Sequence, residues 1–177
     1  MDDRLLQIAP NDGFFMGLAL AQAKEAADKG EVPVGAVVVC DGEVVGAGHN
    51  RREELQNPLA HAEIAAIEAA SRRLGTWRLT ECDLYVTLEP CVMCVGAILQ
   101  ARIRRLVFGC LDPKAGAVQS LYRLCQDERL NHRLPVTGEV FAEASGMLLS
   151  EFFARLRKKN RLSDQPAERW PSPVEGA

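Results

Sequence analysis

The sequence predicts an α/β fold with three layers, α/β/α, around a mixed sheet of five strands. Three observations lead to this prediction. Short apolar, β-branched runs alternate with longer segments of helical periodicity. The first two strand-like runs are joined by only two residues, which indicates an antiparallel hairpin. The later runs are separated by long helical segments, the spacing that parallel crossovers require.

The elements in the first half follow from local signals. Asn11 or Asp12 can cap a first helix, and Gly30 ends it. Asp41-Gly42 is a two-residue turn between two β-branched runs. In order, we expect a helix over 11–29, strands over 34–40 and 43–49, a loop over 50–59, a helix over 61–74 and a strand over 83–87.

The second half continues this alternation. Gly75 ends the helix that His61 begins, and Pro90 suits the start of the next helix because its missing N–H costs nothing there. The two crossovers through these helices are expected to give parallel strand pairs. Further along, we expect a strand over 105–109, a loop over 110–120, short irregular structure over 121–134, a strand over 136–141 and an amphipathic helix over about 144–160.

Length and composition fit a single domain. The chain has 177 residues, of which 47% are hydrophobic and 25% charged, the profile of a globular protein with a full core. We expect residues 1–162 to form one domain and residues 163–177, rich in Pro, Ser and charge, to be a disordered tail. No stretch reads as a signal segment or membrane span, so we expect a cytoplasmic protein. With a net charge of −3, any nucleic-acid binding must depend on a local basic patch.

Two short segments contain the residues that we expect to do chemistry. His61 lies in Ala-His-Ala-Glu, and Cys91 and Cys94 lie in Pro-Cys-Val-Met-Cys. One imidazole and two thiolates suit one Zn²⁺ per subunit, and three protein ligands leave a tetrahedral position open, as in catalytic sites. Glu63 is not needed as a ligand, and a carboxylate in this position is placed to move protons. The other four cysteines are expected to be small apolar residues in or near the core.

The pattern His-x-Glu followed by Pro-Cys-x-x-Cys is the signature of the zinc-dependent nucleobase deaminases. The alternative is a Cys-x-x-Cys redox pair with an unrelated histidine, but a dithiol pair does not require a His-Ala-Glu unit. Zinc in such a site lowers the pKa of a bound water to about 7. Glu63 would pass the proton of that water to N1 of a purine and then protonate the departing amine.

Beyond the metal motif, the chain resembles the bacterial tRNA adenosine deaminases from about residue 14 to residue 157. The matching segments are Glu31-Val-Pro-Val-Gly-Ala-Val, His49-Asn50-Arg51, Ala60-His-Ala-Glu, Tyr85-Val-Thr-Leu-Glu-Pro-Cys-Val-Met-Cys, Arg104-Arg-Leu-Val-Phe-Gly, Asp112-Pro-Lys-Ala-Gly-Ala, Asn131-His-Arg and Glu151-Phe-Phe. The resemblance implies the cytidine-deaminase fold and a homodimer. It also implies conversion of the wobble adenosine of tRNA anticodon loops, chiefly in the arginine acceptor, to inosine.

The same resemblance implies roles for single residues. His61, Cys91 and Cys94 match the zinc ligands, and Glu63 matches the proton shuttle. Further positions match residues that contact the flipped nucleoside, the target ribose or the anticodon loop. These substrate-binding positions are Asn50, Ala60, Asp112, Asn131 and Phe152.

The expected C-terminal helix offers a surface for RNA. Phe152 and Phe153 can stack on bases, although one of them is expected in the core because adjacent helical positions point about 100° apart. The cations within 155–161 can pair with phosphates, or they can be a solvated helix end that suits the helix dipole.

Two other functions remain open from the sequence. A zinc-dependent deaminase of a free base or nucleotide, such as guanine, cytosine or a pyrimidine nucleotide, shares the same signature. The aromatic and basic C-terminal helix favours RNA over these small molecules. A zinc-stabilised RNA-binding module without catalysis is the third possibility, and Glu63 beside only three protein ligands argues against it.

Overall fold

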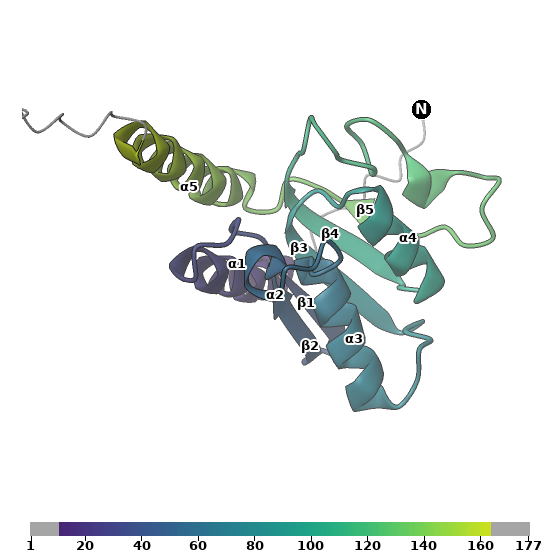
Figure 1. Ribbon diagram of the computed structural model, residues 1–177. Helices are drawn as coiled ribbons and strands as arrows, with labels where there is room; N and C mark the ends of the chain where they lie inside the picture. Colours follow the sequence, from purple (N-terminus) through teal and green to yellow (C-terminus); the bar gives the residue numbers. More distant parts are fainter. Residues whose placement is uncertain (1–10, 164–177) are drawn as a thin grey trace, which may run out of the picture.

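The computed structural model describes residues 11–163 (Figure 1). From residue 164 onward, the tail expected over 163–177 lies outside the described residues, so its disorder and the domain limits stay predictions. The elements are α1 (Asp12–Asp28), β1 (Gly35–Cys40), β2 (Glu43–His49), α2 (Arg52–Leu55), α3 (Ala62–Leu74), β3 (Cys82–Leu88), α4 (Val92–Gln100), β4 (Arg105–Cys110), a 3₁₀ turn (Leu124–Gln126), β5 (Val136–Thr137) and α5 (Ala142–Ser163).

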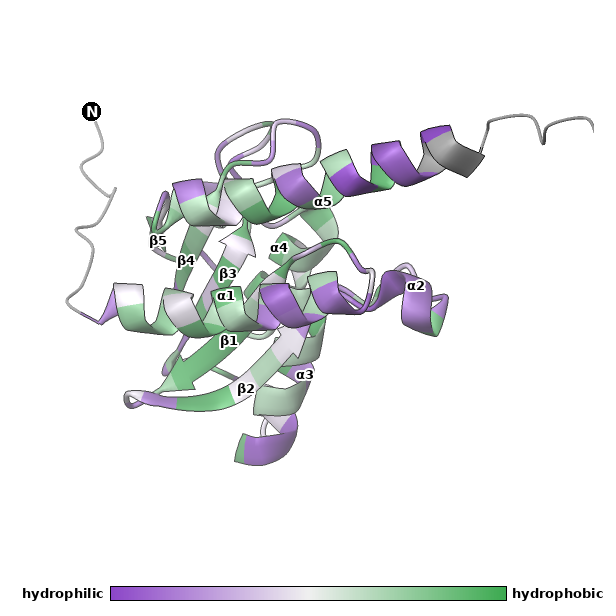
Figure 2. Ribbon diagram, turned by 90° about the vertical axis from the view of Figure 1, so that its left-hand side faces the viewer, coloured by the Kyte–Doolittle hydropathy of each residue, from purple (hydrophilic) through white to green (hydrophobic). Residues whose placement is uncertain are grey.

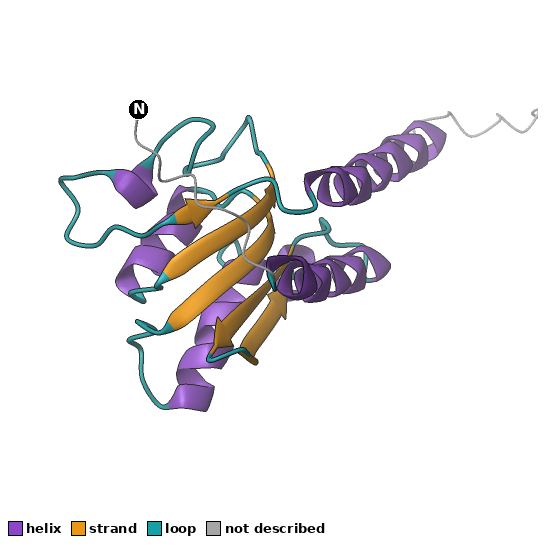
Figure 3. Cartoon of the chain, turned by 180° about the vertical axis from the view of Figure 1, so that it is seen from behind, coloured by secondary structure: helices purple, strands orange, loops and turns teal. Residues whose placement is uncertain are grey.

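The protein has the predicted three layers. Helices α1 and α5 lie on one face of the sheet, and α3 and α4 lie on the other (Figures 1 and 3). The larger apolar core is between the sheet and the α3–α4 layer, and a smaller one lies beneath α1. The predicted fold class is therefore confirmed.

The five strands form one mixed sheet in the order β2-β1-β3-β4-β5. Asp41 and Gly42 have φ angles of 51° and 80°, so the first hairpin turns through two left-handed residues as predicted. Strand β1 is antiparallel to both β2 and β3, whereas β4 is parallel to β3 and β5. The predicted parallel pair across α4 is confirmed, because β3 and β4 are adjacent and parallel. The strands joined by α3, β2 and β3, also run in the same direction, but they do not pair as predicted because β1 lies between them.

Close packing of α3 on the hairpin places the start of that helix at the end of β2. A Cβ atom at Gly46 would lie 2.3 Å from the carbonyl oxygen of Ala66. A Cβ atom at Gly48 would lie 2.8 Å from the carbonyl oxygen of Ala62. The backbones of β2 and α3 can approach this closely because β2 has glycine at these two positions and the facing residues of α3 are alanines. The N-terminus of α3 is thus held against the sheet, beside the loop that follows β2.

Two expected segments differ from the structure. The strand expected over 136–141 ends at Thr137, because Glu139 and Phe141 have φ angles of 64° and 56°, which cannot continue a strand. The loop expected over 50–59 contains the short helix α2, which ends at Gln56 in a left-handed conformation.

Helix α5 is longer than expected, and its second half extends beyond the sheet (Figure 2). Phe153 is 39% exposed and Phe152 is half-buried. The expectation that one of them lies in the core is therefore wrong, because this part of α5 has no sheet beneath it. Within residues 11–163, no helix is both long and apolar enough to cross a membrane.

Candidate active site

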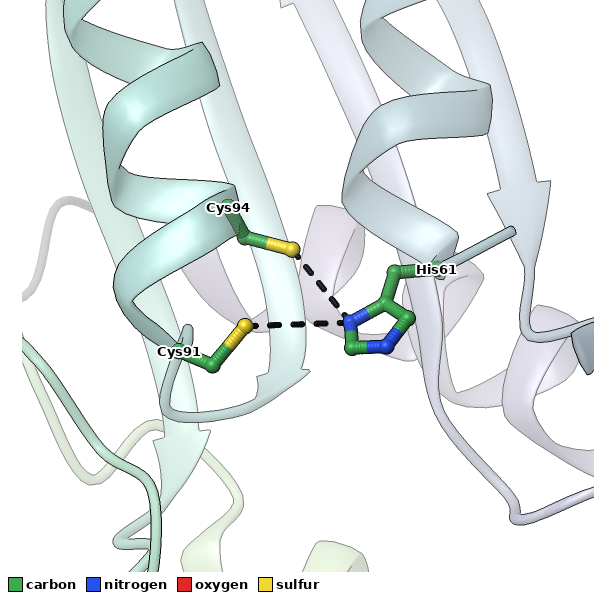
Figure 4. A group of neighbouring side chains, drawn as sticks. All are labelled: His61, Cys91 and Cys94. Atoms are coloured by element: carbon green, nitrogen blue, oxygen red, sulfur yellow. Dashed lines mark hydrogen bonds between the residues drawn. The ribbon is translucent and has the colours of Figure 1, made fainter. Parts of the chain in front are cut away.

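The three predicted metal ligands lie at the starts of two neighbouring helices. His61 is the N-cap residue of α3, and Cys91 is the N-cap residue of α4. Cys94 lies one turn into α4, on the same side as Cys91 (Figure 4). Both cap residues have extended backbones, with ψ of 154° and 174°, so each helix begins only after its ligand. Two helix N-termini therefore face one point, as predicted.

The spacing of the three side chains fits a tetrahedral zinc ion. Nδ1 of His61 lies 3.4 Å from Sγ of Cys94 and 3.8 Å from Sγ of Cys91. All three ligand atoms lie within 4.8 Å of one another. Zn–S bonds of about 2.3 Å and Zn–N bonds of about 2.0 Å at tetrahedral angles place sulfur and nitrogen about 3.5 Å apart. The residues therefore fit zinc by both chemistry and distance.

The proton affinities of these groups are strongly linked. Hydrogen bonds with Cys94 and then with His61 lower the pKa of the Cys91 thiol to about 3. The contact with Cys91, followed by burial, raises the pKa of Cys94. The contact with Cys91 also raises the pKa of His61. The three side chains are close enough for each to alter the pKa of the others. A divalent cation bound between them would displace their protons.

Glu63 lies in the first turn of α3, beside the ligand cluster and outside it. Only 4% of the residue is exposed, and this burial raises the pKa of its carboxyl group. A buried carboxyl group with a raised pKa beside a ligand cluster is typical of groups that transfer protons in catalysis. The three ligands found within the described residues leave the fourth position of a tetrahedral ion for water or substrate.

A cavity of about 200 Å³ opens onto this cluster. It is lined by Val32, Val34, Asn50, Arg52, His61, Ala62, Glu63, Leu88, Glu89, Cys91, Asp112 and Ala115. The structure therefore brings Asn50 and Asp112 into one cavity with the metal cluster and Glu63. Arg52 and Ala115 also line this cavity, and sequence reasoning did not single them out.

The other three expected substrate-binding residues lie outside the cavity lining. Ala60 precedes His61, and its carbonyl oxygen accepts a hydrogen bond of 3.0 Å from the N–H of Arg51. Asn131 is exposed and accepts a hydrogen bond of 3.0 Å from the side chain of Arg102, just beyond the C-terminal end of α4. The nine residues of α4, about 14 Å of helix, separate that end from Cys91.

Phe152 lies on α5, in edge-to-face contact with Phe153, with ring centroids 5.4 Å apart. His132 is held by the carbonyl oxygen of Ile103, 2.9 Å from Nε2, and is not part of the metal cluster. This agrees with a structural role for His132.

Sequence reasoning also missed Glu31 and Glu89, two carboxylates that are 1% and 2% exposed. Each accepts hydrogen bonds from a loop that lines the cavity. Their one local signal is that both belong to the segments shared with the deaminases.

Comparisons with known proteins agree with this site. Residues 10–110 match the family described as "Cytidine and deoxycytidylate deaminase zinc-binding region". A tRNA-specific adenosine deaminase of Bacillus subtilis is 49% identical over 150 residues, which cover 85% of this chain and 93% of the relative. A protein of the same name from Aquifex aeolicus is 49% identical over 144 residues, covering 81% of this chain and 95% of the relative.

Solved structures extend the comparison. A chain from a study of A-to-I editing by tRNA deaminases at the wobble position has a TM-score of 0.74 and 48% identity, covering 77% of this chain and 99% of its own. A guanine deaminase of Nitrosomonas europaea has a TM-score of 0.65 and 26% identity, covering 84% of this chain and 87% of its own. The protein therefore belongs to the cytidine and deoxycytidylate deaminase family and, within it, to the tRNA-specific adenosine deaminases.

Proposed function

We propose that the protein converts the wobble adenosine, position 34 of the tRNA, to inosine by hydrolytic deamination in anticodon loops. The arginine acceptor is the chief substrate that the family resemblance implies. The observation that carries this proposal is the buried carboxylate of Glu63 beside three side chains that fit a zinc ion, in a cavity that Glu63, His61 and Cys91 line. The relatives named for tRNA share 49% identity with this chain, against 26% for the guanine deaminase, which favours RNA as the substrate.

His61, Cys91 and Cys94 would hold the zinc. When bound, zinc acts as a Lewis acid and lowers the pKa of water to about 7, so that hydroxide is available at neutral pH. Glu63 takes the proton from the attacking water and gives it to N1 of adenine as a C–O bond forms at C6. Glu63 then carries the second proton of that water to the amino group, which leaves as ammonia and yields inosine.

The cavity supplies the contacts that orient the nucleoside. Asn50 would contact the flipped nucleoside, Asp112 would lie near its ribose, and Ala60 would border the base next to His61. Support for the first two roles comes from their place in the cavity lining beside Glu63. Unstacking the base costs about a few kcal/mol, and the cost is least where the strand is already unpaired, as in a loop.

Helix α5 would contact the anticodon loop and offset this cost. Neither Phe152 nor Phe153 lies in the core, so both rings are at least partly exposed. Each ring would stack on a base, a contact worth roughly 1–3 kcal/mol. Arg155, Arg157, Lys158 and Lys159 are exposed and would pair with phosphates. Asn131 would touch the anticodon loop on a different surface, near Arg102.

The protein would act in the cytoplasm as a homodimer with one zinc ion per subunit. Exposed apolar side chains on segments that border the cavity support dimer formation, and these are Leu55, Leu59, Val92, Leu121 and Tyr122. Light scattering tests the assembly, since a mass near 19.4 kDa at working concentration would contradict the dimer.

The decisive experiment offers the purified protein an anticodon stem-loop, free cytidine and free guanine, and measures inosine and ammonia. We expect inosine only in the stem-loop. Release of ammonia from guanine or cytidine alone would overturn the RNA substrate and favour the small-molecule deaminase. A zinc-loaded protein that binds the stem-loop without making inosine would instead identify a non-catalytic RNA-binding module.

A further inference from the structure

The carboxylate of Glu89 is enclosed by the loop that carries Asp112. Its Oε2 atom accepts a hydrogen bond of 3.0 Å from the N–H of Asp112, and another from the hydroxyl of Ser120. Its Oε1 atom accepts bonds of 3.1, 2.7 and 2.9 Å from the N–H groups of Val118, Gln119 and Ser120. Within residues 11–163, no cation pairs with this carboxylate. The backbone of the loop therefore compensates the charge.

The loop closes on Glu89 with little free space. A Cβ atom at Gly116 would lie 2.3 Å from the carboxylate, so only glycine fits there. The N–H of Ala117 donates a bond of 2.8 Å to the carbonyl oxygen of Pro90, and Gly116 forms a β-bridge with Cys91. The position of segment 112–120 is thus set by one buried side chain and by the backbone next to a metal ligand.

Glu31 makes a similar arrangement with the segment that follows β2. Its carboxylate accepts hydrogen bonds of 3.3 Å from Nδ2 of Asn50, 3.2 Å from the N–H of Glu53 and 2.7 Å from the N–H of Glu54. Helix α2 has no side-chain cap at its own N-cap residue, Arg51. Glu31 therefore satisfies, from a distant part of the chain, the N–H groups that begin this helix.

Each carboxylate holds one of the two loops that supply polar groups to the cavity. Asn50 and Arg52 come from the loop held by Glu31, whereas Asp112 and Ala115 come from the loop held by Glu89. The oxygens of both carboxylates accept hydrogen bonds from loop N–H groups and side-chain donors, although Glu89 also lines the cavity. We propose that Glu31 and Glu89 are positioning residues, which act through Asn50 and Asp112 to fix where the substrate nucleoside sits.

This proposal rests on the proposed function and makes it more specific. A bound nucleoside must be met by donors and acceptors already in place, because misplacement of about 1 Å can cost a hundredfold in rate. Several hydrogen bonds to one buried carboxylate fix both the direction and the position of the donor loop, which an apolar side chain of equal volume would not do. If the two carboxylates were merely structural, their loss would lower stability, but the catalytic effect of changing Glu89 would not depend on Asp112. The effect of changing Glu31 would likewise not depend on Asn50.

Hydrogen exchange tests the positioning directly, without activity. In Glu89→Gln, the amide takes the place of an acceptor oxygen. We expect amide protons of residues 112–120 to exchange at least about tenfold faster, while those of 50–55 stay unchanged. In Glu31→Gln we expect the reverse. Equal acceleration of both loops in both variants would indicate general loosening and overturn the proposal. Ser120→Ala, which removes a single donor, gives the same test in a milder form if Glu89→Gln does not fold.

Double-mutant cycles on kcat/KM test the functional coupling. Asp112→Ala should cost at least about tenfold in the wild type and less than about threefold in the Glu89→Gln background. The same is expected for Asn50→Ala with Glu31→Gln. The crossed pairs, Glu89→Gln with Asn50→Ala and Glu31→Gln with Asp112→Ala, are matched controls and should be additive. Additive costs in all four pairs would overturn the proposal.

The substrate for these cycles is whichever one the wild-type protein deaminates. Failure of the wild type on the anticodon stem-loop would overturn the RNA assignment alone, because the cycles would then use the accepted small molecule. Additivity with an accepted substrate would overturn the positioning role alone.

Discussion

Asp12 and Arg105 form a two-point ion pair that joins the first turn of α1 to β4. Nη1 and Nη2 of Arg105 lie 3.1 Å and 2.5 Å from the two carboxylate oxygens of Asp12. The hydroxyl of Tyr85 also donates a hydrogen bond of 2.9 Å to Asp12. The Asp12 side chain is 1% exposed and that of Arg105 is 15% exposed, so water does little to screen the pair. The layer formed by α1 is thereby fixed to the sheet on the face opposite the metal cluster.

Removing one partner of this pair is expected to be costly. Asp12→Asn would leave the guanidinium of Arg105 in a buried place with reduced compensation, and we expect a loss of roughly 3–5 kcal/mol in the free energy of unfolding. Arg104→Gln is the matched control, because Arg104 pairs with Asp83 while its own side chain is 50% exposed, so we expect a loss below about 1 kcal/mol. Urea unfolding of the zinc-loaded proteins measures both. Similar losses in the two variants would contradict the prediction.

His49 is expected to make stability depend on pH. Burial lowers its pKa below the ordinary 6.5, Lys29 lowers it further, and Glu25 opposes the shift. Nε2 of His49 lies 3.2 Å from Nζ of Lys29, and Nδ1 lies 3.3 Å from Oε1 of Gln22. Because the unfolded state protonates first as the pH falls below 6.5, this contribution is present above 6.5 and is lost below it.

The measurement compares unfolding free energies of the wild type and His49→Gln across this range. We expect the wild type to lose more stability than the variant as the pH falls through 6.5. Parallel curves would show that His49 keeps its unfolded-state pKa in the folded protein.

The metal cluster predicts a sharp difference between two buried cysteines. Cys94 lies in the cluster and Cys125 lies in the core away from it, where burial raises its pKa to about 12. Cys94→Ser should lower bound zinc well below one ion per chain, whereas Cys125→Ser should leave it near one. A chelator should lower the melting temperature of the wild type and of Cys125→Ser but not of Cys94→Ser, because only a bound ion can stabilise the fold. Equal zinc content in both variants would remove Cys94 from the ligand set.

Glu63 is expected to be essential for turnover and dispensable for metal binding. Glu63→Ala removes the proton carrier without touching the three ligands, so we expect zinc and fold to be kept while kcat falls by roughly 10²–10⁴-fold or more. Metal analysis, circular dichroism and inosine formation measure the three quantities. Unchanged turnover would take Glu63 out of the mechanism, and loss of zinc would make it part of the metal site.

The sequence predicted the three-ligand cluster because its members are defined by local patterns. A cap residue opens each helix, so His61, Cys91 and Cys94 are placed by signals within a few residues of each. The ligand types, one imidazole and two thiolates, and the Cys-x-x-Cys spacing then indicate zinc without knowledge of the tertiary structure. Asn50 and Asp112 were found through family resemblance, and the cavity brings them to the same cluster.

Long-range partners are what the sequence did not reveal. In the sequence, Glu31 and Glu89 look like ordinary loop charges, because the N–H groups that they bind lie far away along the chain. Strand periodicity likewise says that β3 is a strand but not that it pairs with β1. The early end of β5 depends on left-handed backbones at Glu139 and Phe141, residue types that give no local warning of such conformations.

Lys158 and Lys159 on α5 allow the RNA surface to be separated from a solvated helix end. Both are exposed and have no ion pair within the described residues. If they contact phosphates, Lys158→Gln/Lys159→Gln should weaken binding of an anticodon stem-loop and reduce the slope of log affinity against log salt by about 0.7 per lost contact.

The matched control changes two adjacent cations at the end of another helix. Arg72 and Arg73 close α3, are exposed, and pair with Glu68 and Glu43. Arg72→Gln/Arg73→Gln should therefore leave the salt slope unchanged. A helix-dipole role predicts instead that each double variant loses a few tenths of a kcal/mol of stability and neither changes RNA binding. Identical salt slopes in the wild type and both double variants would exclude these two lysines from the RNA surface. A flatter slope in the α5 variant alone would show that the lysines contact phosphates.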